Sequence, residues 1–165
     1  MTIERMGFEK DKRIIKKYGN ISESCQIGDK VCNFRSQGEK RLAQYLELLK
    51  LSGHIRDWAF EQTTFKTSAG EKFWIVDFDV LNNDGTFEYY EFKGMFKQSD
   101  ATKLQLLYEC KPDIQLTYVF ENKREAGKLS RRKVSRQLKA IMIQSTSGKG
   151  LTEFDGRVPK KRKRR

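Results

Sequence analysis

The chain has 165 residues and contains few histidines, prolines and cysteines. The single histidine, His54, excludes any mechanism that needs two, and its position after Gly53 predicts an exposed loop residue. The three cysteines, Cys25, Cys32 and Cys110, are odd in number and include no CxxC pair. We therefore expect neither a disulfide scaffold nor a zinc knuckle, and a reducing intracellular setting fits best.

Long apolar stretches are also absent. No run approaches the roughly 18 residues that a membrane-spanning helix needs, and the first nineteen residues are charged throughout, unlike a secretory signal. Hydrophobic residues make up 37 % of the chain and aromatic residues 12 %. This is enough apolar material for one modest core, so we expect a single domain with a tail, and no membrane partner.

Positive charge is concentrated at one end of the sequence. The formal net charge is +12, and residues 121–165 alone carry sixteen basic and four acidic side chains. Residues 31–120 are slightly acidic, and the last nine residues hold seven basic side chains. Such a segment favours a polyanionic partner, because each phosphate neutralised releases counterions. A solubilising tail is the alternative.

The pattern of apolar residues predicts an α/β (α+β) fold. A hairpin or arm is expected over 18–34, and a helix begins at Ser36 and ends at Ser52-Gly53. Further along the chain we expect three strands, over 58–65, 73–81 and 86–93, and then a second helix over 101–110. A last strand over 115–120 and a basic helix over 123–139 follow. The order of the core is then α-β-β-β-α-β, a mixed central sheet flanked by helices.

The segment IVDFDVLNNDGTFEYYEFKG carries the chemistry. A three-residue loop, Asn83 to Gly85, would pair Asn82 with Thr86 and place Asp77 across from Glu91. Alternation would then put four polar residues on one face of the strands: Asp77, Asp79, Glu91 and Lys93. The opposite face, the natural core face, would carry six apolar residues: Trp74, Val76, Phe78, Val80, Tyr90 and Phe92. A two-residue loop would put Asp77 and Glu91 on opposite faces.

Two interpretations of these acids remain open. Carboxylates within apolar strands are costly unless a cation compensates them, and Mg²⁺ or Mn²⁺ prefers oxygen ligands. A salt-bridge patch on a solvated face would need no metal. Glu39 shares a helix face with Leu42 and Leu46, which would bring a third carboxylate to the sheet, but Ser36 and Glu39 also form a capping-box pattern. Asp79 is a candidate spare ligand.

The motifs FRSQGE, EQTTF, VDFDV, EYYEFKG and LTYVF, in this order, resemble the PD-(D/E)xK nuclease superfamily. They are most similar to phage endonuclease I and related phage Holliday-junction-resolvase-like proteins, and the resemblance covers about residues 17–120. It implies a restriction-endonuclease-like core and a metal-dependent DNA endonuclease. Four segments follow: an N-terminal arm at 1–33, a nuclease core at 34–122, a basic helical extension at 123–156 and a disordered basic tail at 157–165.

The resemblance also implies roles for individual residues. Asp77 would be the bridging metal ligand, and Glu91, the Phe92 carbonyl and Glu39 would be the other ligands. The metal would be Mg²⁺, for which Mn²⁺ could substitute. Lys93 would orient or help deprotonate the attacking water. Further residues are candidates for contacts with DNA: Arg35, Gln62, Lys103, Arg131, Arg132, Lys133, Lys160, Lys161 and Arg162.

The resulting hypothesis is a nuclease selective for branched DNA, such as four-way junctions. Paired cuts imply a homodimer, with contacts from residues 18–34. The alternatives are a sequence-specific homing or transposase-type endonuclease of the same superfamily, and a non-catalytic DNA-binding protein. PKKRKRR resembles a nuclear localisation signal, so the nucleus is an alternative to the host cytoplasm expected for a phage protein.

Overall fold

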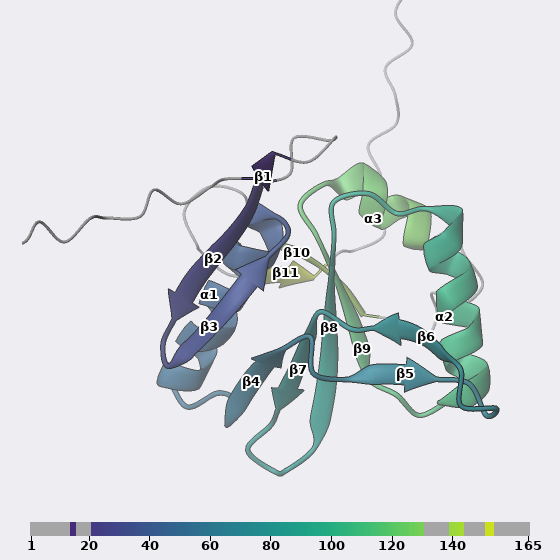
Figure 1. Cartoon of the computed structure of the whole chain (residues 1–165), viewed down its shortest axis with the longest axis horizontal. Coiled ribbons are helices and arrows are strands. Elements are labelled where there is room, and N and C mark those ends of the chain that lie inside the picture. The colour runs from purple at the N-terminus through teal and green to yellow at the C-terminus, as the bar shows by residue number, and fades with distance from the viewer. Residues whose placement is uncertain (1–13, 16–20, 131–138, 144–150, 154–165) are drawn as a thin grey trace, which may run out of the picture.

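The computed structural model describes residues 14–15, 21–130, 139–143 and 151–153, which form three helices and three sheets (Figure 1). The helices are α1 (Gln37–Leu51), α2 (Gln98–Cys110) and α3 (Lys123–Ser130). The strands are β1 (Ile14–Ile15), β2 (Ile21–Ile27), β3 (Lys30–Phe34), β4 (Asp57–Phe60), β5 (Thr64–Lys66), β6 (Lys72–Ile75), β7 (Phe78–Leu81), β8 (Phe87–Lys93), β9 (Leu116–Phe120), β10 (Lys139–Ile143) and β11 (Leu151–Glu153). None of the described helices is long and apolar enough to span a bilayer.

The central sheet has six strands in the order β11-β10-β9-β8-β7-β4. β4, β7 and β8 are antiparallel neighbours, whereas β8 and β9 are parallel and connected through α2. Along the chain, the elements of this core follow the order α1, β4, β7, β8, α2 and β9. The predicted mixed α/β fold with a mixed central sheet and helices is therefore confirmed.

Both faces of the central sheet are covered. On one face, α1 and the β2–β3 hairpin pack on Trp58, Phe78 and Val80. On the other, α2 and the β5–β6 ribbon enclose Tyr118 and Phe120 in a second cluster. Successive residues of β9 thus belong to different clusters, as the alternation of a strand requires. Of the acids in or beside the central sheet, Asp77, Asp79 and Glu91 are therefore buried beneath other elements.

Two strands that the sequence predicts as continuous are broken. The segment 58–65 forms β4 and β5, and 73–81 forms β6 and β7, so each changes from one sheet to another. The breaks lie side by side: the Glu61 N–H donates to the Asp77 carbonyl at 2.8 Å, and the Val76 N–H donates to the Thr63 carbonyl at 3.2 Å. Glu61 turns the chain with a φ of 51°, in the left-handed region.

These breaks correct the predicted core face. Trp74 and Val76 do not pack with Phe78 and Val80, because the bend at Asp77 turns them into the cluster beneath α2. The two strands bend together, so pairing continues across the break and these backbone groups keep their partners.

The hairpin register between β7 and β8 is as predicted for the three-residue loop. The Asn82 N–H donates to the Thr86 carbonyl at 2.9 Å, and Gly85 has a φ of 87°. The ladder pairs Leu81 with Phe87 and Phe78 with Tyr90. One further step places Asp77 across from Glu91, so the alternative two-residue loop is excluded.

The ends of the core also bear on two expectations. The hairpin expected before the first helix is present as β2 and β3, which a two-residue loop at Gly28-Asp29 connects. The predicted basic helix is present over Lys123–Ser130, residues 131–138 lie outside the described residues, and Lys139–Ile143 and Leu151–Glu153 are strands at the sheet edge, so the helix predicted to reach 139 does not include Lys139. The sequence KAIMI is rich in residues that favour strands, and it pairs with β9. Residues 1–13, 16–20 and 154–165, which include part of the predicted arm and all of the basic tail, lie outside the described residues.

Candidate active site

Asp77 and Glu91 meet where the sheet changes direction. Asp77 lies in the break between β6 and β7, and Glu91 lies on β8; each is 3 % exposed. The Asp77 N–H donates to Glu91 Oε2 at 3.1 Å, and the Phe92 N–H donates to Asp77 Oδ2 at 2.8 Å. The predicted pairing is therefore present. A salt-bridge patch on a solvated face is excluded, because both carboxylates are buried.

Lys93 lies beside this pair and joins β8 to α2. Its Nζ is 2.8 Å from Glu91 Oε1 and 3.3 Å from Asp100 Oδ1. Asp100 is fixed in the first turn of α2, where its Oδ2 accepts from the Lys97 N–H at 2.7 Å. Burial alone would lower the pKa of Lys93, but the Glu91 and Asp100 carboxylates outweigh burial and raise it. Lys93 therefore carries a fixed positive charge at neutral pH.

Glu39 reaches the same site from the first turn of α1. Ser36 caps the helix, since its Oγ accepts from the Glu39 N–H at 3.2 Å. The Glu39 carboxylate does not complete the capping box in the usual way, because its Oε2 accepts from the Arg35 N–H at 2.7 Å. Glu39 Oε1 faces the Arg35 side chain instead, with Nε at 3.9 Å. Glu39 thus stabilises the helix start and still directs one oxygen toward the other acids.

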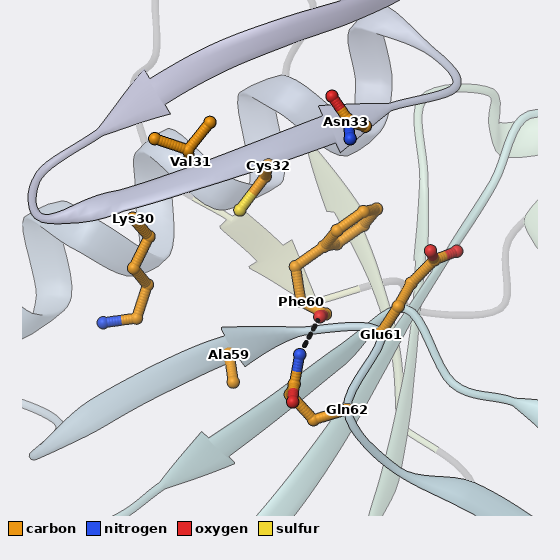
Figure 2. Close-up of a pocket in the computed structure, with 8 residues that line it drawn as sticks. All are labelled: Lys30, Val31, Cys32, Asn33, Ala59, Phe60, Glu61 and Gln62. Atoms are coloured by element: carbon orange, nitrogen blue, oxygen red, sulfur yellow. Dashed lines mark hydrogen bonds between the residues drawn. The ribbon is translucent and has the colours of Figure 1, made fainter.

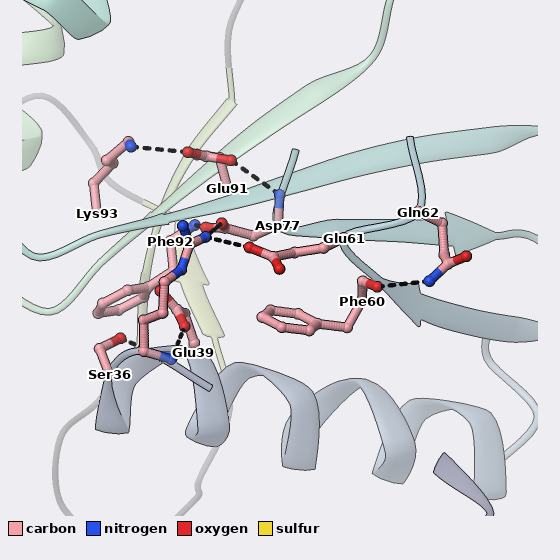
Figure 3. A network of polar contacts seen from close by, with 10 residues as sticks. Ser36, Glu39, Phe60, Glu61, Gln62, Asp77, Glu91, Phe92 and Lys93 are labelled. Atoms are coloured by element: carbon pink, nitrogen blue, oxygen red, sulfur yellow. Dashed lines mark hydrogen bonds and ion pairs between the residues drawn. The ribbon is translucent and has the colours of Figure 1, made fainter. Parts of the chain in front are cut away.

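Arg35 and Glu61 complete the cluster. Figure 3 shows Glu39, Glu61 and Asp77 between the sheet and the start of α1. Arg35 Nη2 lies 3.4 Å from Asp77 Oδ1 and also pairs with Glu61. The sequence predicts that Arg35 contacts phosphate, whereas here its guanidinium contacts carboxylates. The sequence patterns do not single out Glu61, although a carboxylate following the apolar stretch Trp58-Ala59-Phe60 is the same signal that indicates Asp77.

Arg35, Glu39, Asp77, Glu91, Phe92 and Lys93 line a pocket of about 450 Å³, whereas Glu61 lines the pocket that also contains Gln62. Lys103 of α2 is part of the lining, beside the candidate metal ligands, as expected for a residue that contacts phosphate. Lys72 of β6, which the sequence does not single out, lines it as well. The remaining wall is the β5–β6 ribbon: Thr64, Phe73, Trp74 and Ile75.

Other candidates lie elsewhere. Gln62 lines a separate pocket between β3 and the end of β4, where its Nε2 donates to the Phe60 carbonyl at 3.0 Å, and it points away from Glu61 (Figure 2). Asp79, the candidate spare ligand, is outside the acid pocket, and its Oδ2 accepts from Thr63 Oγ1 at 2.5 Å. His54 is exposed, as expected. Six proposed DNA contacts lie outside the described residues: Arg131, Arg132, Lys133, Lys160, Lys161 and Arg162.

The charge balance of the site favours a cation. Burial, then the carboxylates of Glu91 and Glu39, raise the pKa of Asp77 well above its usual value. Burial also raises the pKa of Glu39. Asp77 Oδ1 and Glu39 Oε1 both face the Arg35 guanidinium, so the open side of the site already attracts positive charge.

The donor set fits a hard divalent cation. Asp77, Glu91, Glu39 and the Phe92 carbonyl supply only oxygens, which Mg²⁺ and Mn²⁺ prefer. Within the described residues, no three Asp, Glu, His or Cys side chains already converge as a ready-made metal centre. One oxygen of each acid accepts from a backbone N–H instead, and the other oxygen faces Lys93 or Arg35, so these second oxygens are the ones that would bind a metal.

The raised pKa values predict that stability without metal falls with rising pH. A carboxyl group whose pKa is higher in the folded protein stabilises the fold while protonated, and this stabilisation disappears as the pH rises through the folded pKa. In EDTA, the melting temperature of the wild type should therefore fall as the pH rises above the ordinary carboxyl range and through the raised pKa values of Asp77 and Glu39. Asp77→Asn should fall less, and a divalent cation should flatten the wild-type curve. Identical slopes for the two proteins in EDTA would contradict the assigned shifts.

Comparison with known proteins identifies no relative, since no family model, no curated protein and no solved structure matches this chain.

Proposed function

We propose that this protein is a metal-dependent DNA endonuclease with a restriction-endonuclease-like core, acting on branched DNA. The observation that carries the proposal is the buried contact of Asp77 with Glu91, with Lys93 Nζ 2.8 Å from the same Glu91. Two carboxylates and a lysine held together at the bend of a sheet combine metal ligands with a positive charge. The element order α1, β4, β7, β8, α2, β9 agrees with the family that the motifs resemble.

Each residue has a distinct role in this proposal. Asp77, Glu91, Glu39 and the Phe92 carbonyl would hold Mg²⁺, which lowers the pKa of a bound water and polarises the phosphate. Lys93 is better suited to orient that water and to stabilise negative charge than to act as the base, because its pKa is raised. Lys72 and Lys103 line the pocket and would hold the phosphates on either side of the cleaved bond.

Burial disfavours the alternative of a non-catalytic DNA-binding protein. Ionised carboxylates that are buried destabilise a fold, and binding to DNA phosphates through basic side chains does not require them. A sequence-specific endonuclease of the same superfamily remains the second candidate, because the pocket alone carries no information about the bases.

A homodimer is part of the proposal, since paired cuts on opposing strands need two sites. The β2–β3 hairpin, within the predicted dimer segment 18–34, is the proposed contact. Val31 on β3 supports it, being 72 % exposed.

The substrate class can be tested by cleavage of a synthetic four-way junction and of linear duplexes with the same arm sequences. In Mg²⁺ we expect the junction to be cut much faster than the duplexes, and neither to be cut in EDTA. Equal cutting of junction and duplexes at defined sequences would favour the sequence-specific alternative. No cutting of any DNA in Mg²⁺ or Mn²⁺ would contradict the proposal.

The basic tail makes a separate prediction about affinity. Deleting residues 157–165 removes seven positive side chains and none of the proposed ligands, so cleavage should persist at low salt. The slope of log K against log salt should shrink by about 0.9 for each duplex phosphate that the protein no longer neutralises, or roughly three to five units in total. Fluorescence anisotropy across a salt series measures it. An unchanged slope would mean that the tail does not bind DNA.

A further inference from the structure

The Arg35 guanidinium lies between two sets of carboxylates. On the inner side it faces Asp77 Oδ1 at 3.4 Å and Glu39 Oε1 at 3.9 Å. On the outer side it pairs with Glu61. The Arg35 side chain is 53 % exposed and that of Glu61 is 34 % exposed, whereas Asp77 is buried. Arg35 lines the acid pocket and Glu61 lines the pocket of Gln62, so Arg35 joins the buried acids to the rim of the acid pocket, where Glu61 begins the neighbouring surface.

Glu61 is held at this rim by the backbone. Its φ of 51° is uncommon for a residue other than glycine, and such conformations cluster at functional sites. The Glu61 N–H donates to the carbonyl of Asp77 at 2.8 Å, so the two residues keep a fixed relation across the paired breaks. Glu61 thus offers Arg35 a second anionic partner that does not depend on the inner acids.

Arg35 and a divalent cation compete for the same oxygens. A guanidinium and a metal ion cannot both lie within about 4 Å of Asp77 Oδ1 without strong repulsion in a partly buried site. The same nitrogen, Arg35 Nη2, contacts both Glu61 and Asp77 Oδ1, so a small movement of the guanidinium can give up the contact with Asp77 and keep the one with Glu61.

We propose that Arg35 is the resident counter-cation of the acid site and that Glu61 is its positioning residue. When a divalent cation takes the inner position, Glu61 retains the guanidinium at the rim, where it faces a DNA phosphate. Metal binding and DNA binding are thereby coupled through one side chain. The coupling to DNA rests on the proposed function, whereas the exchange of cations does not.

Calorimetric titration of Mn²⁺ into the metal-free protein tests the exchange. Arg35→Gln should raise the Mn²⁺ affinity and Glu61→Gln should lower it, each by about 5-fold or more. Glu61 acts mainly through Arg35, so the effect of Glu61→Gln should largely disappear in the double variant.

The Arg41–Glu121 pair supplies the matched control, because it also joins α1 to a distant glutamate but lies outside the acid pocket. Arg41→Gln should leave the Mn²⁺ affinity unchanged. Strictly additive effects in the Arg35/Glu61 double variant, or Mn²⁺ affinity in Arg35→Gln equal to that of the wild type, would overturn the exchange. Absence of Mn²⁺ binding in every variant would overturn the exchange together with the metal dependence of the proposed function.

Binding of a labelled four-way junction in EDTA and in Ca²⁺ tests the coupling. Arg35→Gln should weaken binding in Ca²⁺ and leave it nearly unchanged in EDTA, where Arg35 is held by the acids. An equal loss of affinity in both conditions would overturn the coupling and leave the proposed nuclease function standing, because Arg35 would then reach DNA without leaving Asp77.

Discussion

Asp77→Asn is expected to reduce cleavage by about 10²–10³-fold or more, without lowering stability in the absence of metal. The loss of activity follows because the Asp77 carboxylate is the proposed central metal ligand: its Oδ2 accepts from the Phe92 N–H, while its Oδ1 faces the open pocket. Asparagine has the same shape but is a weaker ligand for a hard cation.

The stability of Asp77→Asn distinguishes this site from a structural ion pair. The asparagine Oδ1 can still accept from the Phe92 N–H, and the substitution removes a buried charge whose pKa is raised by burial and by neighbouring acids. The melting temperature in EDTA at neutral pH should therefore be equal to or above that of the wild type, and Mg²⁺ should no longer raise it.

Asp113→Asn provides the control for Asp77→Asn, since Asp113 is exposed in the loop between α2 and β9. It removes the same charge and should change neither cleavage nor the response to Mg²⁺. Wild-type cleavage by Asp77→Asn, or a marked decrease of its stability in EDTA, would show that Asp77 is structural.

Gly38→Ala is expected to destabilise the fold by about 1–3 kcal/mol, as overpacking of a core does. A Cβ at Gly38 would lie 1.8 Å from Cζ of the Phe92 ring and 2.2 Å from its Cε1. The ring cannot easily yield, because it is buried in the cluster that includes Leu42 and Phe78. Moving Phe92 would also displace its backbone N–H, which donates to Asp77 Oδ2. The cleavage activity should therefore fall together with the stability.

Urea unfolding measures the effect of Gly38→Ala, with Gly94→Ala as the matched control. A Cβ at Gly94 meets no atom within 4 Å, although Gly94 lies next to Lys93. Gly94→Ala should therefore unfold near the wild-type midpoint. Equal midpoints for the two variants would mean that α1 does not pack closely against the Phe92 ring.

Much of the fold could be predicted from local patterns. The loop Asn83 to Gly85 determines the register of β7 and β8, because only Gly85 takes a positive φ there. Ser36 marks the start of α1 by the same kind of local chemistry, a side-chain cap. The breaks at Glu61 and Asp77 could not be predicted, because each depends on the other strand bending at the same place.

The candidate site could be predicted to the same extent. Asp77, Glu91 and Lys93 follow from alternation along two paired strands, and the structure brings them together. Glu61 could not be predicted from the sequence. In a continuous strand, Glu61 and Gln62 would point to opposite faces, and Gln62 is the residue of this motif that the resemblance assigns to DNA contact. Only the left-handed turn at Glu61 directs its side chain to Arg35. Lys72 escapes prediction because it enters the pocket through the β5–β6 ribbon, which exists only once the strands break.

The central claim is that the buried acids Asp77 and Glu91 hydrolyse DNA with a divalent cation. Single-turnover cleavage of a labelled four-way junction by Glu91→Gln and by Glu88→Gln tests it most directly, because both residues lie on β8 and only Glu91 is in the acid pocket. In Mg²⁺ we predict that Glu88→Gln cleaves at close to the wild-type rate, whereas Glu91→Gln is slower by about 10²-fold or more. Cleavage by Glu91→Gln at the wild-type rate would contradict the claim.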